Sequence, residues 1–209
     1  NNDSIDSAVA LINKAKKPFI VWGQGVILGK AEEEFKNFVE KSGIPAAWTI
    51  LGLSALPTSH ELNVGMVGMH GNYGPNILTN KCDLLIAVGM RFDDRVTGDP
   101  STYASQAKVI HLEIDPAEVD KNIKVDVPVI GNCKESLKMI TNKIDKRSHK
   151  KWISKFDDLM KIEFDKVIKS DLSPNKKGLT MGESIIAINE YTIGDAIIVT
   201  DVGQHQMVE

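Results

Sequence analysis

The chain has 209 residues, of which 42% are hydrophobic and 25% are charged, and its formal net charge at pH 7 is −3. This balance is ordinary for a globular protein and gives no electrostatic reason to expect nucleic acid or an anionic membrane as a partner. No apolar run approaches the ~20 residues that span a bilayer, and no signal peptide opens the chain. The two cysteines, Cys82 and Cys133, form neither a metal-binding spacing nor a disulfide framework. We therefore expect a reducing cytoplasm and no metal ligands.

Apolar runs and helical periodicity predict helices that alternate with strands. We expect helices over residues 4–16, 31–42, 72–81, 135–144, 152–168 and 182–190, and strands over residues 18–22, 45–49, 84–88, 108–114, 125–130 and 196–200. A short helix is expected to begin at Asp115-Pro116. The run 84–88 is apolar throughout, which is typical of a strand buried on both faces of a parallel sheet. The pattern predicts the α/β class, with a doubly wound parallel sheet flanked by helices.

Two polar segments divide the sequence. Residues 146–151 are basic and polar, and residues 171–178 contain a proline and two lysines, as a linker does. We expect a domain over 1–146, a helix and linker over 147–178, and the truncated start of another domain over 179–209, since one helix and one strand cannot bury a core. The chain also begins with asparagine rather than methionine, which fits a piece of a longer protein.

The strand at 84–88 ends at Gly89, and four charged residues follow it closely. They are Arg91, Asp93, Asp94 and Arg95. Ligands in open α/β sheets bind beyond the carboxyl ends of the strands. Guanidinium and carboxylate groups released there indicate a site for an anionic, hydrogen-bonding ligand. A solvated turn joined by Arg–Asp pairs is the alternative.

A glycine cluster follows the first strand. Gly23, Gly25 and Gly29 have the spacing G-x-G-x-x-x-G, one residue longer than the dinucleotide fingerprint, and no acidic residue follows the second strand. An ordinary NAD site is therefore not favoured. The glycines can bring the backbone close to a phosphate, or they can simply form a tight turn.

Other candidate positions indicate binding rather than catalysis. His70 has no metal-binding spacing around it, so we reject a zinc site and leave open a stacking or a structural role. Glu113 and Glu118 flank a strand end, where a carboxylate accepts ribose or ribityl hydroxyls or is simply solvated. Residues 201–205 follow the last predicted strand and can offer backbone N–H groups to phosphate. No Ser-His-Asp, Cys-His or paired-carboxylate arrangement is evident in the sequence.

Ordered motifs across nearly the whole chain resemble the catalytic subunit of the acetohydroxyacid synthase (acetolactate synthase) family. They are Gly68-Met69-His70-Gly71, Ile86-Ala87-Val88-Gly89-Met90-Arg91-Phe92-Asp93-Asp94-Arg95-Val96-Thr97-Gly98, Asp115-Pro116-Ala117-Glu118 and Gly203-Gln204-His205-Gln206-Met207. The resemblance implies three similar α/β domains that use thiamine diphosphate and Mg²⁺, with FAD in a Rossmann-like central domain. The implied reaction decarboxylates pyruvate and joins the two-carbon unit to a second 2-ketoacid, on the way to branched-chain amino acids. The flavin has no net redox role in it.

The resemblance also implies site residues. The expected FAD contacts are Gly23, Gln24, Gly25, Thr49, Ile50, Leu51, Gly68, Met69, His70, Gly89, Met90, Arg91, Asp93, Arg95, Glu113, Ile114, Glu118, Asn132 and Cys133. Met69 and Arg95 would also border the substrate channel, and Glu113, Ile114 and Glu118 would take the adenosine end. Val202, Gly203, Gln204 and His205 would begin the thiamine diphosphate site.

Three positions depart from the family pattern: Met90 replaces a smaller residue, Ser54 replaces a glycine, and Asn132 replaces an aspartate. The family's activating glutamate and its Mg²⁺ ligands would lie in other domains, so this piece is expected to be inactive alone. The implied assembly is a homodimer or homotetramer, with a regulatory small subunit as a further partner. The alternatives are a related thiamine diphosphate enzyme, such as glyoxylate carboligase or pyruvate oxidase, and a free-standing nucleotide-binding module.

Overall fold

The structure is a computed structural model that describes residues 2–172 and 178–203. The chain divides into two compact units, Asn1–Asp157 and Asp158–Glu209. No helix of the described residues is long and apolar enough to cross a bilayer.

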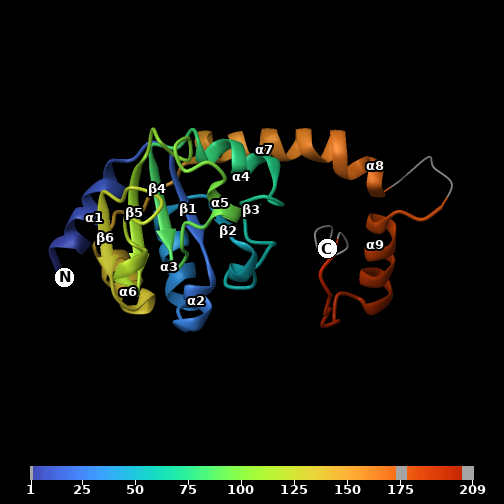
Figure 1. The fold of residues 1–209 in the computed structure, drawn as a ribbon, viewed down its shortest axis with the longest axis horizontal. Helices are drawn as coiled ribbons and strands as arrows, with labels where there is room; N and C mark the ends of the chain where they lie inside the picture. The colour runs from blue at the N-terminus through green and yellow to red at the C-terminus, as the bar shows by residue number, and fades with distance from the viewer. Residues whose placement is uncertain (1, 173–177, 204–209) are drawn as a thin grey trace. The chain divides into compact units, whose positions relative to one another are not determined.

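The first unit is built on a six-stranded sheet in which every neighbouring pair of strands is parallel (Figure 1). Its strands are β1 (Pro18–Trp22), β2 (Ala46–Trp48), β3 (Asn63–Met66), β4 (Leu84–Val88), β5 (Lys108–Glu113) and β6 (Val127–Ile130). Their spatial order is β3-β2-β1-β4-β5-β6. The chain thus winds outward from β1 in one direction and from β4 in the other, which confirms the predicted doubly wound sheet. The switch point lies between β1 and β4.

The central strands are apolar because both of their faces are covered. All five residues of β4 are buried, and β4 pairs along its whole length with β1 and β5. Side chains alternate between the two faces of a strand. In β1, Ile20 joins the apolar cluster on one face, whereas the neighbouring Phe19 lies with its ring centroid 5.2 Å from that of Phe156.

Three helices cover the first face: α1 (Asn2–Lys14), α3 (Glu32–Ser42) and α6 (Cys133–Lys143). Their apolar stripes enter the same core as the strands, as the sequence predicts for Ile5, Ala8 and Ile12 of α1. The start of α7 (Lys150–Glu163) covers the second face. There the Trp152 indole donates a 2.8 Å hydrogen bond to the carbonyl oxygen of Pro18. Shorter elements fill the connections: α2 (Gln24–Leu28), the 3₁₀ turn η1 (Ile50–Gly52), α4 (Tyr73–Thr79), α5 (Asp94–Thr97) and the 3₁₀ turn η2 (Pro116–Glu118).

One strand of the sheet is missing from the sequence prediction. The edge strand β3 lies in the segment rich in glycine and methionine, and its pairing with β2 shifts register between Ala46 and Trp48. Gly65 takes a φ of +104° there, as at a β-bulge, so the period of two that marks a strand is interrupted. The short helices α2 and α5 were also not predicted, since neither is long enough to show a helical period.

The second unit is helical in its described part. It contains the end of α7, a π-helical turn over Phe164–Ile168, α8 (Lys169–Leu172) and α9 (Met181–Thr192). Thr180 and Glu183 form a capping box at the start of α9, which confirms the helix predicted over 182–190. The strand predicted over 196–200 is wrong: these residues form no strand, and Ile197 is 94% exposed. A strand needs a partner for its backbone groups, and the described part of this unit contains no other strand. The predicted linker over 171–178 falls largely outside the described residues.

Candidate functional site

A cleft of about 500 Å³ opens at the carboxyl ends of β1, β2, β4 and β5, at the switch point of the sheet. We call it the switch-point cleft. Its lining residues are Gly23, Gln24, Gly25, Leu28, Thr49, Ile50, Leu51, Gly89, Met90, Arg91, Asp93, Arg95, Val96, Glu113, Ile114 and Glu118. Fourteen of the residues expected to contact a flavin cofactor are therefore brought together in one cleft. This placement is what the rule for open α/β sheets leads one to expect.

The floor of the cleft is made by two glycine turns in backbone contact. Gly25 N donates a 2.8 Å hydrogen bond to Gly89 O, and Gly23 N donates a 3.0 Å bond to Val88 O. A Cβ atom on Gly25 would lie 2.6 Å from the Gly89 Cα, and Gly89 itself has a φ of +56°. Side chains are therefore excluded from this contact, and a ligand can approach the backbone of both turns.

An apolar wall comes from the turn after β2. Thr49 N donates a 2.9 Å hydrogen bond to Trp22 O, and the Trp22 indole donates a 2.8 Å bond to Gly52 O. These bonds hold η1 against the end of β1. The Ile50 and Leu51 side chains remain 55% and 61% exposed beside the cleft. Large apolar side chains presented in this way suit a flat apolar part of a ligand.

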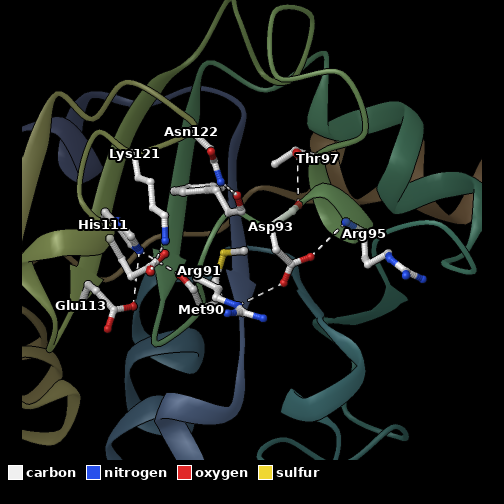
Figure 2. Close-up of polar contacts among 11 residues, drawn as sticks. Met90, Arg91, Asp93, Arg95, Thr97, His111, Glu113, Lys121 and Asn122 are labelled. Atoms are coloured by element: carbon white, nitrogen blue, oxygen red, sulfur yellow. Dashed lines mark hydrogen bonds and ion pairs between the residues drawn. The ribbon is translucent and has the colours of Figure 1, made fainter.

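The charged rim follows β4. Asp93 caps α5 by accepting a 3.0 Å hydrogen bond from Arg95 N, and its other carboxylate oxygen lies 3.5 Å from Arg91 Nε. The Arg91 side chain is 68% exposed. In Figure 2 the Arg91 and Asp93 side chains face each other, whereas the Arg95 guanidinium points away from that carboxylate. Two guanidiniums at this edge can bind phosphate. Of the Arg–Asp pairs that the alternative of a solvated turn requires, the structure contains the one between Arg91 and Asp93.

A carboxylate and a buried histidine lie on the β5 side of the cleft. Glu113 Oε1 accepts hydrogen bonds from Ile114 N at 2.8 Å and Asp115 N at 3.2 Å, and Glu113 Oε2 lies 3.6 Å from His111 Nε2. The neighbouring His111 imidazole, with help from the two backbone donors, lowers the pKa of Glu113 below its usual value despite partial burial. Glu113 is therefore an anionic acceptor at neutral pH, suited to ligand hydroxyls.

A smaller side pocket of about 260 Å³ adjoins the cleft. It shares Gly25, Leu28, Gly89, Glu113 and Ile114 with the cleft and adds Gly29, Leu112, Gly131, Asn132 and Cys133. Asn132 caps α6 by accepting a 2.8 Å hydrogen bond from Lys134 N. Burial raises the pKa of the Cys133 thiol to about 12, so Cys133 is a neutral, apolar wall at physiological pH.

Some expected site residues lie elsewhere. Gly68, Met69 and His70 line neither cavity, although Met69 N donates a 2.8 Å hydrogen bond to Arg95 O and so contacts the backbone of the rim. Val202 and Gly203 belong to the second unit, where Val202 is exposed. Gln204 and His205 lie outside the described residues.

Leu28, Val96 and His111 were not identified as site residues from the sequence. Leu28 and Val96 line the cleft from α2 and α5, two helices too short to predict. The signal for His111 was its spacing of two from Glu113, which places both side chains on the same face of β5.

Comparison with known proteins adds to this geometry. The family model described as "Thiamine pyrophosphate enzyme, central domain" matches residues 5–140. The chain is 39% identical to a probable acetolactate synthase large subunit of Methanococcus aeolicus, over 97% of the chain and 36% of the relative. It is 39% identical to the acetolactate synthase large subunit of Lactococcus lactis subsp. lactis, over 99% of the chain and 35% of the relative. It is 41% identical to the acetolactate synthase large subunit of Corynebacterium glutamicum, over 97% of the chain and 33% of the relative. The chain thus spans about a third of the length of these relatives.

Proposed function

Since the chain belongs to the family of thiamine pyrophosphate enzymes and matches their central domain, we propose that it is the central part of an acetolactate synthase large subunit. The complete enzyme would decarboxylate pyruvate and join the two-carbon unit to a second pyruvate or to 2-ketobutyrate. The relatives named acetolactate synthase align with nearly all of this chain, which supports the proposal.

We further propose that the switch-point cleft binds FAD. The observation that carries this is the contact between the Gly25 and Gly89 turns, which leaves a side-chain-free floor where a pyrophosphate can approach the backbone. Arg91 supplies positive charge to the phosphates, and Ile50 and Leu51 supply an apolar wall for the flavin ring. Glu113, Ile114 and Glu118 would bind the adenosine end, with Asn132 and Cys133 in the side pocket beyond.

The remaining chemistry belongs to the complete enzyme. Thiamine diphosphate with Mg²⁺ would supply the decarboxylating and carbon-joining chemistry there, and the stretch 202–205 would contribute the first phosphate contacts. Met69 and Arg95 would border the channel for the 2-ketoacid. We assign residues 1–146 to the flavin domain, 147–178 to a helix and linker, and 179–209 to the start of the thiamine diphosphate domain. The enzyme would be a cytoplasmic homodimer or homotetramer, with a regulatory small subunit as a further partner.

Nucleotide titration tests the cofactor assignment. The purified 209-residue chain is titrated separately with FAD and NAD, and binding is followed by flavin fluorescence for FAD and by calorimetry for both. We expect FAD to bind more tightly, although more weakly than in a complete enzyme, because further domains would help to enclose the flavin. Binding of NAD as tight as or tighter than that of FAD would overturn the assignment.

A further inference from the structure

His111 is a histidine with no exposed surface, placed directly behind the wall of the switch-point cleft. It lies in β5 between the paired residues Ala87 of β4 and Pro128 of β6. Its ring packs against Phe92, with the ring centroids 5.0 Å apart. A buried imidazole brings two polar nitrogens into the protein interior, and each is costly unless it has a partner. The position is otherwise suited to an apolar side chain.

The partners of His111 are parts of the cleft. Its Nε2 lies 2.8 Å from Met90 O and 3.6 Å from Glu113 Oε2 (Figure 2). A carbonyl oxygen can only accept, so Nε2 carries the hydrogen and donates it to Met90 O. Within the described part of the chain, Nδ1 has no hydrogen-bond partner. In the described part of the chain, the ring therefore makes its hydrogen bond on the cleft side, through Nε2.

The two groups beside His111 Nε2 come from different strand ends. Met90 O belongs to the turn after β4, one residue before Arg91, and Glu113 closes β5. Glu113 Oε1 is already engaged by Ile114 N and Asp115 N. The Glu113 oxygen that remains for a ligand is Oε2, which is the one facing His111.

We propose that His111 is a positioning residue for the adenosine half of the cofactor. The hydrogen bond to Met90 O fixes the imidazole ring so that its Nε2 faces Glu113 Oε2. This electrostatic contact holds the Glu113 carboxylate in the orientation that accepts hydrogen bonds from ribose hydroxyls. It acts through Glu113 and does not touch the ligand. This proposal rests on the proposed binding of FAD in the switch-point cleft.

A double-mutant cycle on FAD affinity tests the proposal. FAD is titrated into the wild-type chain, His111→Phe, Glu113→Gln and the double variant. Each single variant is expected to lose about tenfold or more in affinity, the scale of a charge-assisted hydrogen bond, and His111→Phe should cost nothing further once Glu113 is replaced. His111→Gln, whose amide nitrogen reaches a place similar to Nε2, should recover most of the loss. His111→Asn, which is too short, should not.

A second ligand separates positioning from general damage. FMN carries the flavin and one phosphate but lacks the adenosine half, so its affinity should be the same in wild type, His111→Phe and His111→Asn. Additive losses in the cycle, or equal losses of FAD and FMN accompanied by a lower melting temperature, would show that His111 only supports the fold. If His111→Phe does not fold, the comparison of His111→Gln with His111→Asn decides the question. If the wild-type chain binds NAD more tightly than FAD, the proposed function itself is contradicted. If FAD affinity is unaltered in every His111 variant, only the proposal for His111 is overturned.

Discussion

Gly25 N donates a 2.8 Å hydrogen bond to Gly89 O, and this bond joins the first turn of α2, which follows β1, to the turn after β4. The two turns follow the strands on either side of the switch point, and Gly25 and Gly89 are 64 positions apart in the sequence. The contact sets how closely the two backbones approach, and thereby the shape of the cleft floor.

Gly25→Ala should therefore damage both stability and the cleft. The new Cβ would lie 2.6 Å from Gly89 Cα and 2.8 Å from Gly89 O, and these are backbone atoms that cannot rotate away. We expect the free energy of unfolding to fall by about 1–3 kcal/mol, as for overpacking elsewhere, and FAD binding to weaken with it. Urea unfolding followed by circular dichroism measures the first effect. Gln24→Ala, next to it in the same turn but with an exposed side chain, is the stability control and should unfold like wild type.

Arg91→Ala should weaken FAD binding and leave the fold intact. A charge-assisted contact to phosphate is worth roughly 1.5–3 kcal/mol, so a loss of about tenfold to a hundredfold in affinity is expected. The side chain is largely exposed and its pair with Asp93 is long, at 3.5 Å, so the melting temperature without ligand should barely change. Arg147→Ala removes the same charge outside the cleft and should leave FAD affinity unaltered. A large drop in melting temperature with unchanged affinity would assign Arg91 to structure.

Sequence reasoning was most successful for the central sheet. The strand over 84–88 and its neighbours could be predicted because a strand buried on both faces has an unbroken run of apolar residues in the sequence. The edge strand β3 could not, because a bulge at Gly65 disturbs its period. The apolar run 196–200 led to a wrong prediction of a strand. Apolar residues favour burial, but a strand also requires a pairing partner for its backbone groups.

The site was predictable to the extent that it follows strand ends. Gly23, Gly89 and Glu113 each come directly after or at the end of a strand, and the parallel order brings such positions together. The hydrogen bond from His111 to Met90 was not predictable, since it joins a residue of β5 to one in the turn after β4, 21 positions away, and depends on how β4 and β5 pair. The loop 68–70 supports the rim through Arg95 O and does not line the cleft, a distinction that only tertiary packing makes.

Both cysteines should be unreactive in the native chain. Burial raises the pKa of Cys82 and of Cys133 to about 12, so at pH 8 the thiolate that reacts with disulfide reagents is scarce. A reagent such as Ellman's should label neither thiol quickly in buffer and should label both in denaturant. A fast native reaction of one thiol would contradict the burial of its side chain.

The same two thiols should destabilise the fold in alkali. Their folded pKa lies above the unfolded value of about 8.5, so the unfolded chain releases protons first as the pH rises. The stabilisation is complete below that value and is lost as the pH rises towards about 12. Replacing both cysteines by alanine should flatten the fall of the urea midpoint between pH 8 and pH 10. An equally steep fall in the double variant would be the contrary result.

Glu113 should contribute the opposite dependence in acid. Its pKa is lowered in the folded chain, chiefly by the neighbouring His111 imidazole, so its stabilisation is present above the ordinary value of about 4.3 and is lost as the pH falls through the folded value. In Glu113→Gln the urea midpoint should therefore decline less steeply below about pH 4.3 than in wild type. Glu61→Gln, an exposed carboxylate outside the cleft, is the matched control and should follow the wild-type curve.

The last prediction concerns turnover. The matched relatives are about three times as long as this chain, and the matching family model is that of a central domain. The switch-point cleft offers a backbone floor, arginines and an anionic acceptor, which are groups that bind and orient a nucleotide. Under the proposed function, a diphosphate cofactor also needs a metal ion to neutralise its charge and fix its pose.

We therefore expect no acetolactate from the purified 209-residue chain when pyruvate, Mg²⁺, thiamine diphosphate and FAD are all supplied. Colorimetric assay of acetoin, formed from acetolactate in acid, measures this against a complete acetolactate synthase as the positive control. Turnover that persists after repurification, and that Gly25→Ala abolishes, would show that the chain carries an active site of its own.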